Sequence, residues 1–345
     1  MSGVGHEGGS STLPAAAPAL QRPKEGTATI GYIIRRFFQA ILVVLGVLII
    51  VFVLFHLEGP EALARSIYTT PRASQTQLNY IIRIYGWNLP LWDQLWRELV
   101  NYAHLDFGRS NTNQSVKSLL ITCMPRSLML VGMSIVLSLI IAIPLGVFQT
   151  VRRNKPSDYT LTGLAFIFYA MPAFVLGTVL ILLFEDTWHI MTPISQSETI
   201  WQIAGDWRQI TLPVLTLSAL TVASFSRYMR SSMMDALTED YVRTARAKGA
   251  GPGRVLFRHA FRNALIPIIT LLGLSLPAIA GGAVITETVF NYPGMGFLTY
   301  TAAVSNQVQV VVGTTIVATV LTVIGSLAAD ILYAVADPRI RYANR

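Results

Sequence analysis

Charged residues are scarce in this sequence. Lys, Arg, Asp and Glu make up 13% of the 345 residues, about half of the roughly 25% found in typical soluble domains. Hydrophobic residues make up 52%. This composition is typical of an integral membrane protein, and it overrides the suggestion of several soluble domains that the length alone would give.

Cysteine and catalytic motifs are also nearly absent. The single cysteine, Cys123, excludes an intrachain disulfide and a zinc cluster built from cysteines. The sequence contains no P-loop, no H-E-x-x-H and no G-x-S-x-G. It therefore gives no support for a nucleotide-binding site, a zinc protease site or the nucleophile elbow of an α/β-hydrolase. We therefore expect no catalytic residue, no metal ligand and no cofactor bound by this chain.

Long apolar runs are what the sequence has in abundance. Each is near the length of about 20 residues that a helix needs to cross a bilayer. The interiors of these runs hold no charged residue, which argues against an ion-coupled transporter, a voltage sensor and an intramembrane protease. The sequence predicts an all-α integral membrane protein with six transmembrane helices, at 37–55, 127–148, 161–184, 209–226, 264–286 and 308–330.

The remaining segments divide the chain further. Residues 1–29 are rich in Gly, Ser, Ala and Pro, a composition typical of a disordered tail. We expect the first transmembrane helix within 30–56, an external region at 57–123, and a core of five helices at 124–335. A short C-terminus follows at 336–345.

Loop charge predicts the orientation of the chain. The short loop 149–160 carries Arg152, Arg153 and Lys155, and the loop 227–263 carries eight Lys or Arg against three acids. Cytoplasmic loops are enriched in Lys and Arg, so both loops and both termini are expected in the cytoplasm. Topology thus accounts for the net charge of +8 without a nucleic acid partner.

The external region holds a tryptophan-rich stretch, GWNLPLWDQLWRELV, at 86–100. Its spacing predicts a small amphipathic helix. Two interpretations remain open here. Tryptophan is common at the membrane interface, so the helix fits a position on the bilayer surface, and it equally fits a docking surface for an external partner.

The basic segment, defined here as residues 239–262, stands out in the cytoplasmic loops. Thr238 is predicted as the N-cap of a helix that runs to about Lys248. GAGPG at 249–253 must break that helix, with Gly249 in a left-handed conformation. A second helix is expected from about Pro252, with an apolar stripe on one face and arginines on another. The arginines are Arg254, Arg258 and Arg262.

The enrichment of Lys and Arg in cytoplasmic loops would account for the positive charge of the basic segment. An amphipathic helix that lies on anionic lipid would also account for it. Neither accounts for a short turn bounded by glycines. We favour a rigid turn that docks into a groove on a partner protein.

The sequence around this segment, EDYVRTARAKGAGPGRVLFRHAFRNALIPIIT, closely resembles the cytoplasmic EAA loop of ABC-importer permeases. Arg243-Thr244-Ala245 occupies the position of E-A-A, and Gly249 that of the following glycine. RRFFQAILVVLGVLIIVFVLFHL, LPLWDQLWRELVNYAHLDFGRS, FIFYAMPAFVLG, ETVFNYPGMGFL and DILYAVADPRIRYA resemble other parts of the dipeptide, oligopeptide and nickel subfamily. The resemblance covers about residues 31–343 and fits the B-type permease. One departure is EGPEA at 58–62, where the subfamily has Pro-Gly-Asp-Pro.

The resemblance implies the type I ABC importer permease fold in a bacterial or archaeal plasma membrane. It implies a second, C-type permease, two ATPase subunits that bind ATP, and an external substrate-binding protein as partners. Within the coupling loop 227–263, residues 241–256 would be the coupling helix. Ala245 and Gly249 would pack in a groove of the ATPase and Arg243, Arg246 and Lys248 would lie on its rim. Thr244 and Gly253 complete the expected contact set.

Two residues near the outer end are candidates for the transport pathway. Glu287 would meet a peptide ammonium, and Asn291 opens the sequence NYPGMG, in which Pro293 and Gly294 are predicted as the centre of a type II turn. The alternative that we favour is that this sequence forms only a tight outer connection.

The expected cargo is a di- or oligopeptide. Nickel chelates and oligosaccharides are alternatives within the same importer class. A membrane receptor or scaffold that docks a soluble partner without transport is the alternative from a different class.

Overall fold

The structure of the protein is a computed structural model that describes residues 25–67, 74–194, 199–281 and 283–336. Regular elements within these ranges are all helices, apart from one isolated bridge between Arg109 and Ser115. The expectations for residues 1–24 and 337–345 lie outside the described residues. The chain forms two compact units, residues 1–41 and 42–345.

The first unit is represented by the first half of α1 (Glu25–His56). This helix begins before the predicted end of the disordered tail, so the expectation of disorder is wrong for residues 25–29. Phe37 and Phe38 are exposed and contact each other edge to face, with ring centroids 6.3 Å apart. Large exposed aromatic side chains on an apolar helix suit contact with lipid.

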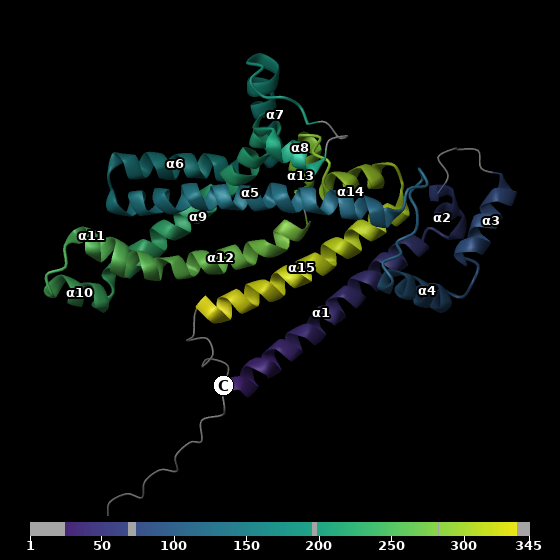
Figure 1. Cartoon of the computed structure of the whole chain (residues 1–345), viewed down its shortest axis with the longest axis horizontal. Coiled ribbons are helices and arrows are strands. Elements are labelled where there is room, and N and C mark those ends of the chain that lie inside the picture. Colours follow the sequence, from purple (N-terminus) through teal and green to yellow (C-terminus); the bar gives the residue numbers. More distant parts are fainter. Residues whose placement is uncertain (1–24, 68–73, 195–198, 282, 337–345) are drawn as a thin grey trace, which may run out of the picture. The chain divides into compact units, whose positions relative to one another are not determined.

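Five helices of the described chain are long and apolar enough to cross a membrane. They are Arg35–His56 within α1, Val116–Val151 (α5), Trp207–Thr238 (α9), Pro252–Ser275 and Val308–Ala329. The last two lie largely within α12 (Phe261–Gly281) and α15 (Val308–Ala336). Figure 1 shows α5 running along α9, and α12 running along α15.

The remaining predicted span, 161–184, is not a single straight helix. It consists of α6 (Pro156–Ala170) and α7 (Ala173–Ile181), which continues into a π-helical turn, η1 (Leu182–Thr187). The two parts are bent by 99°. Met171 between them is extended (φ −76°, ψ 126°), the conformation that the ring of Pro172 favours at the residue before it.

Other prolines do not interrupt their helices. Pro125 and Pro144 lie inside α5, and Pro213 lies inside α9. Membrane helices accept proline where neighbouring groups satisfy the freed carbonyls. Among these prolines, Pro172 marks a break, whereas Pro125, Pro144 and Pro213 lie within continuous helices.

The helices α5 and α9 approach each other closely at Gly146. A Cβ atom there would lie 2.6 Å from Met229 Cβ and 2.7 Å from the carbonyl oxygen of Ser226. Hydroxyls bridge the same pair of helices: Ser138 Oγ donates to the carbonyls of Ser134 and Ser218. Small residues and hydroxyls are the usual means by which membrane helices pack closely.

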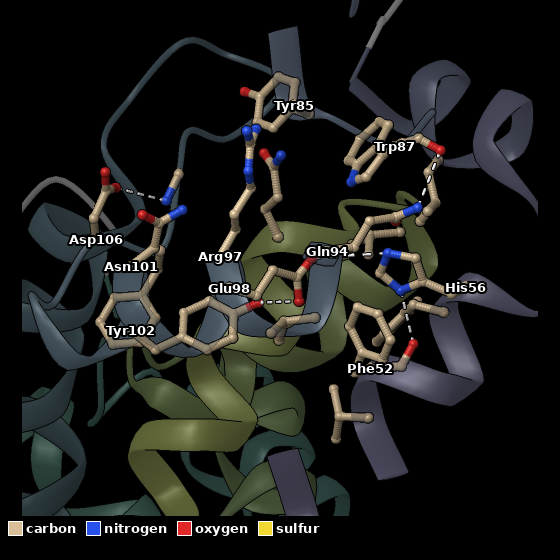
Figure 2. Close-up of a pocket in the computed structure, with 18 of the residues that line it drawn as sticks. Phe52, His56, Tyr85, Trp87, Gln94, Arg97, Glu98, Asn101, Tyr102 and Asp106 are labelled. Atoms are coloured by element: carbon tan, nitrogen blue, oxygen red, sulfur yellow. Dashed lines mark hydrogen bonds and ion pairs between the residues drawn. The ribbon is translucent and has the colours of Figure 1, made fainter. Parts of the chain in front are cut away.

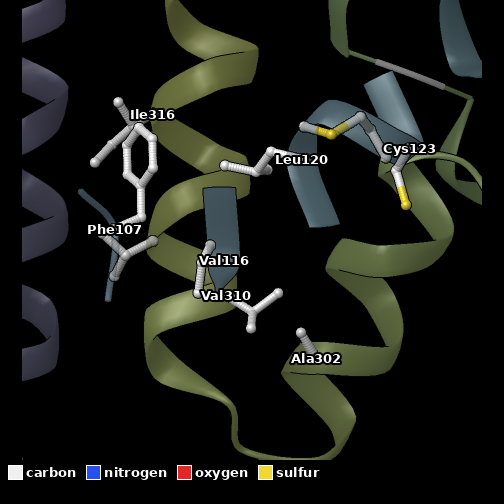
Figure 3. Close-up of a cluster of buried hydrophobic side chains, with 9 residues drawn as sticks. Phe107, Val116, Leu120, Cys123, Ala302, Val310 and Ile316 are labelled. Atoms are coloured by element: carbon white, nitrogen blue, oxygen red, sulfur yellow. The ribbon is translucent and has the colours of Figure 1, made fainter. Parts of the chain in front are cut away.

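One end of the core is built from four apolar segments. A cluster of buried side chains joins the start of α5 and the 104–109 segment to α14 (Met295–Val304) and the start of α15 (Figure 3). Phe107, Val116, Leu120, Cys123, Ala302, Val310 and Ile316 belong to it. Cys123 therefore has a packing role in the described chain.

Short helices cover the external region at 57–123. They are α2 (Pro60–Ile67), α3 (Gln75–Tyr85) and α4 (Leu91–Ala103), and α8 (Ile200–Gly205) lies in a later connection. The predicted amphipathic helix is confirmed as α4, on which Trp92 and Trp96 are exposed. Trp87 precedes that helix and stacks on Tyr85, with ring centroids 4.9 Å apart.

A buried polar network fixes the corner between α13 (Val284–Val289) and α14. Glu287 is fully buried. Its Oε1 accepts hydrogen bonds from Ser127 Oγ (2.7 Å) and the Ala283 amide (3.3 Å), and its Oε2 accepts one from the Phe297 amide (3.0 Å). Ser127 Oγ in turn accepts a hydrogen bond from the Met295 amide at 2.7 Å.

The connection 291–294 in this corner is not the predicted type II turn. That turn needs a positive φ at its third residue, but Gly294 has φ −100° and ψ −173°. The left-handed residue is instead Asn291, with φ 52°. Tyr292 Oη donates to the carbonyl of Arg126 (2.8 Å), and Arg126 donates to the carbonyl of Pro293 (3.3 Å). These bonds to α5 set the path of the connection.

The contact at Gly146 predicts a large difference between two glycines of α5. Gly146→Ala forces Met229 or the backbone of α9 to shift, and overpacking of this kind costs about 1–3 kcal/mol. Gly132→Ala is the matched control because a Cβ there meets no atom within 4 Å, and alanine favours the helix. Thermal unfolding of the purified protein should show a lower midpoint for Gly146→Ala only. Equal midpoints would contradict the close packing.

The corner network predicts that Glu287→Gln destabilises the protein. The amide nitrogen of glutamine replaces one acceptor oxygen and leaves a buried N–H or O–H donor without a partner, at a cost of about 1–3 kcal/mol. Glu58→Gln, at an exposed carboxylate, serves as the control in the same thermal unfolding assay. A Glu287→Gln protein that unfolds like the wild type but loses transport would favour a pathway role instead.

Candidate functional site

The basic segment begins where α9 ends. Thr238 is the last residue of α9, and its Oγ1 donates to the carbonyl of Asp235 at 2.8 Å. Glu239 is extended (φ −67°, ψ 151°) and takes the N-cap position of α10 (Asp240–Ala247). The prediction of Thr238 as the N-cap is therefore wrong, because α9 continues through that residue.

The end of α10 has the predicted left-handed glycine. Gly249 has φ 82°, and its amide donates to the carbonyl of Arg246 at 2.9 Å. The Ala250 amide donates to the carbonyl of Ala245 at 3.1 Å. This pair of bonds is a Schellman motif, which satisfies the last carbonyls of a helix. A Cβ at Gly249 would meet nothing within 4 Å, so backbone conformation alone explains the glycine.

The chain turns back after this glycine. Gly251 is extended, and Pro252 opens the short α11 (Pro252–Arg254). A π-helical turn, η2 (Val255–Ala260), then leads into α12. The predicted break and the start of the second helix near Pro252 are confirmed, but this helix is not regular through its first turns.

One face of the basic segment packs against the rest of the chain. Val242 and Val255 are 0% and 2% exposed, and Ala260 is fully buried. Ala260 belongs to an apolar cluster that joins η2 and α12 to α9 and α5 through Met229, Met233, Ala236 and Val147. The turn is therefore attached directly to the long helices, and a displacement of the turn must displace them.

The other face of the basic segment is exposed. Arg243, Thr244, Arg246, Lys248, Gly249 and Gly253 all lie on it. Ala245 does not, because it is 8% exposed and faces the chain. The expectation that Ala245 packs in a groove of a partner does not fit this placement. Its small side chain instead allows α10 to lie close to its own core.

The exposed face is strongly positive. Arg254, Arg258 and Arg262 add to the cations of α10. Within the described residues of this segment, the ion pair that forms is Arg243 with Asp240, at 3.4 Å and with both side chains largely exposed. Exposed pairs of this kind contribute little to stability. The surplus of positive charge is thus available to an acidic or carbonyl-rich surface.

A buried ion pair near this end of the molecule was not predicted from the sequence. Asp158 of α6 is 1% exposed and accepts two hydrogen bonds from Arg230 of α9, at 3.0 Å from Nε and 2.8 Å from Nη2. The Asn154 amide donates to the same carboxylate at 3.1 Å. Two parallel bonds of this kind fix orientation as well as distance, so α6 is held to α9.

The 152–155 loop and the basic segment lie at the same end of the core, and α2–α4 lie at the other end (Figure 1). The two strongly basic connections therefore face the same side. This arrangement agrees with the loop charges, which predicted one common side for both.

Glu287 and Asn291, the two candidate pathway residues, lie in the outer corner. Glu287 is buried in the network with Ser127, and Asn291 is exposed at the left-handed position. Within the described residues no group of three or more His, Cys, Asp or Glu is placed to hold a metal ion.

Residues 142–342 match the family described as "Binding-protein-dependent transport system inner membrane component". The match includes the basic segment, the bent pair α6–α7 and the outer corner. It covers more than half of the chain.

Named relatives agree with this match over nearly the whole length. The chain is 37% identical to the "Oligopeptide transport system permease protein AppB" of Bacillus subtilis over 315 residues, which are 90% of this chain and 99% of the relative. It is 34% identical to the "Oligopeptide transport system permease protein OppB" of Haemophilus influenzae, over 75% of this chain and 83% of the relative. It is 31% identical to the "Glutathione transport system permease protein GsiC" of Escherichia coli K12, over 91% and 99%.

The described chain is helical, with five helices long and apolar enough to cross a membrane. With the family match, this assigns the chain to the inner-membrane permeases of binding-protein-dependent ABC importers.

Proposed function

We propose that this chain is the B-type half of an importer for di- or oligopeptides. The names of relatives at 31–37% identity, two of them oligopeptide permeases and one a glutathione permease, support a peptide cargo. They favour peptides over nickel chelates and oligosaccharides. A second, C-type permease would supply the other half of the pathway, and an external binding protein would deliver the peptide.

In this proposal the bent pair α6–α7 counts as one crossing of the membrane, so that the chain has six spans. An even number of spans places both termini on one side. The two basic connections, 152–155 and 239–262, lie at one end of the core, and the charge rule places that end in the cytoplasm.

The observation that carries the proposal is the two-sided construction of the basic segment. Its outward face is cationic and exposed, while its inward face packs against α9, α12 and α5. Such a segment can bind an ATPase subunit on one face and transmit that subunit's movement to the helices on the other. Arg243, Thr244, Arg246, Lys248, Gly249 and Gly253 are the proposed contacts.

The energy for transport would come from ATP bound and hydrolysed on two partner subunits. When these subunits close on each other, the basic segment would follow and carry α9 and α12 with it. The bond pair between Asp158 and Arg230 would pass the displacement to α6. The chain itself then needs no cofactor and no titratable group within its spans.

The coupling role predicts a specific defect for Gly249→Val. A β-branched residue in the left-handed region is strained, so the Schellman turn rearranges while the helices stay packed. Peptide uptake should fall at least about tenfold and co-purification of the ATPase should weaken, with normal protein in the membrane. Gly205→Val is the control, because Gly205 lies in α8 outside the basic segment, has no positive φ, and a Cβ there meets no atom within 4 Å. Normal uptake and normal co-purification in Gly249→Val would disprove the coupling role.

Charge reversal tests the outward face separately. Arg246→Glu with Lys248→Glu should abolish ATPase co-purification, since both side chains are exposed cations on the proposed contact face. Arg83→Glu with Lys117→Glu makes the same change in charge on the external region and should leave co-purification intact. Equal behaviour of the two double variants would show that net charge, and not this face, determines binding.

A further inference from the structure

A cavity of about 760 Å³ lies in the external part of the second unit. It is bounded by the outer end of α1, by α4, by the 104–109 segment and by the start of α15 (Figure 2). None of its lining residues belongs to the basic segment or to the corner around Glu287. It is thus separate from both sites described above.

His56 presents an unused hydrogen-bond acceptor in this cavity. Its side chain is 9% exposed. Nδ1 lies 2.8 Å from the carbonyl oxygen of Phe52, and a carbonyl only accepts, so Nδ1 carries the proton. Nε2 is buried and has no hydrogen-bond partner among the described residues. The carboxylate of Glu98 lies close by, with its Oε1 3.9 Å from His56 Nε2. The His56 ring points toward this carboxylate (Figure 2).

Gln94 and Glu98 on α4 add further acceptors. The amide nitrogen of Gln94 donates to the carbonyls of Leu89 (2.6 Å) and Trp87 (3.2 Å), which leaves its buried Oε1 without a donor among the described residues. Glu98 Oε2 accepts a hydrogen bond from Tyr102 Oη at 3.0 Å. Burial raises the pKa of Glu98, against the opposing effects of His56 and Tyr102, so its charge lacks full compensation within the chain.

Two guanidinium groups also line the cavity. Arg109 donates to the backbone and side-chain oxygens of Asn113, both at 3.2 Å. Neither Arg97 nor Arg109 forms an ion pair with a described carboxylate. A simple cation would meet repulsion from both arginines. A molecule that carries an anion beside its cation would not.

We propose that this cavity binds a zwitterion whose cation is a primary ammonium group. The three N–H donors of the ammonium match the acceptors His56 Nε2, Gln94 Oε1 and Glu98 Oε1, which face the cavity with no donor of their own. Unpaired buried acceptors are costly, and a bound ammonium would satisfy them. Arg97 and Arg109 face the anion of the same molecule.

Two sources carry this chemistry. One is the ethanolamine headgroup of a phospholipid, in which a phosphate accompanies the ammonium. The apolar side chains of Leu48, Val51 and Phe55 on the same wall would then contact the acyl chains. The other is a free peptide with its ammonium and carboxylate. The inference does not depend on the proposed function, since binding and not transport is measured.

Native mass spectrometry of the full chain distinguishes the sources. In the lipid arm, the protein is exchanged into phosphatidylethanolamine or phosphatidylcholine of equal chain length. Both lipids are zwitterions, but the choline nitrogen has no N–H donor. In the peptide arm, trialanine is compared with N-acetyl-trialanine, which lacks the ammonium. We expect at least about tenfold preference for the donor-bearing ligand in one arm.

Glu98→Gln should remove this preference while preserving the shape of the side chain, and His56→Asn should weaken it independently. Asp93→Asn is the control, because Asp93 lies exposed on α4 and does not line the cavity. The proposal is overturned if the protein binds the two lipids equally and the two peptides equally. A preference for the donor-bearing ligand that survives Glu98→Gln also overturns it.

Discussion

The close packing of α5 against α9 is the interaction on which the rest of the core depends. Gly146 admits no side chain at this contact, and Met229, which occupies the space, also belongs to the cluster that carries the basic segment. Met229 thus contacts α5 and also belongs to the cluster that joins the basic segment to the long helices. Because packed interfaces shift between discrete arrangements rather than deform smoothly, this connection suits the transmission of a mechanical displacement.

The scarcity of charge sets a second constraint. The interiors of the predicted spans hold no charged residue, which argues against coupling to an ion or proton gradient within the bilayer. Glu287 is fully buried, and hydrogen bonds within the chain satisfy its carboxylate. In the proposed mechanism energy reaches the helices through a surface, and the exposed cationic face at 239–262 is the proposed one because its other face packs against them.

Local features of the site followed from the sequence, and distant contacts did not. Gly249 was predicted in a left-handed cap because a helix ending before GAGPG has few other solutions. Thr238 was assigned wrongly because its capping propensity was outweighed by the packing of α9. The partnership of Asp158 with Arg230 joins residues far apart in the chain, and no local pattern encodes it. The unpaired acceptors around His56 and Gln94 likewise exist only once α1 and α4 are brought together.

Site-directed crosslinking tests the central claim most directly. The native Cys123 is buried, so a thiol introduced by Lys248→Cys reacts selectively with a bifunctional photo-crosslinker in intact membranes of cells that express the whole transporter. The account predicts a crosslink from this position to an ATPase subunit, with a yield that changes when ATP is bound. Trp201→Cys, at an exposed residue of α8, should give no such product. No ATPase crosslink from position 248, or equal products from both positions, would contradict the account.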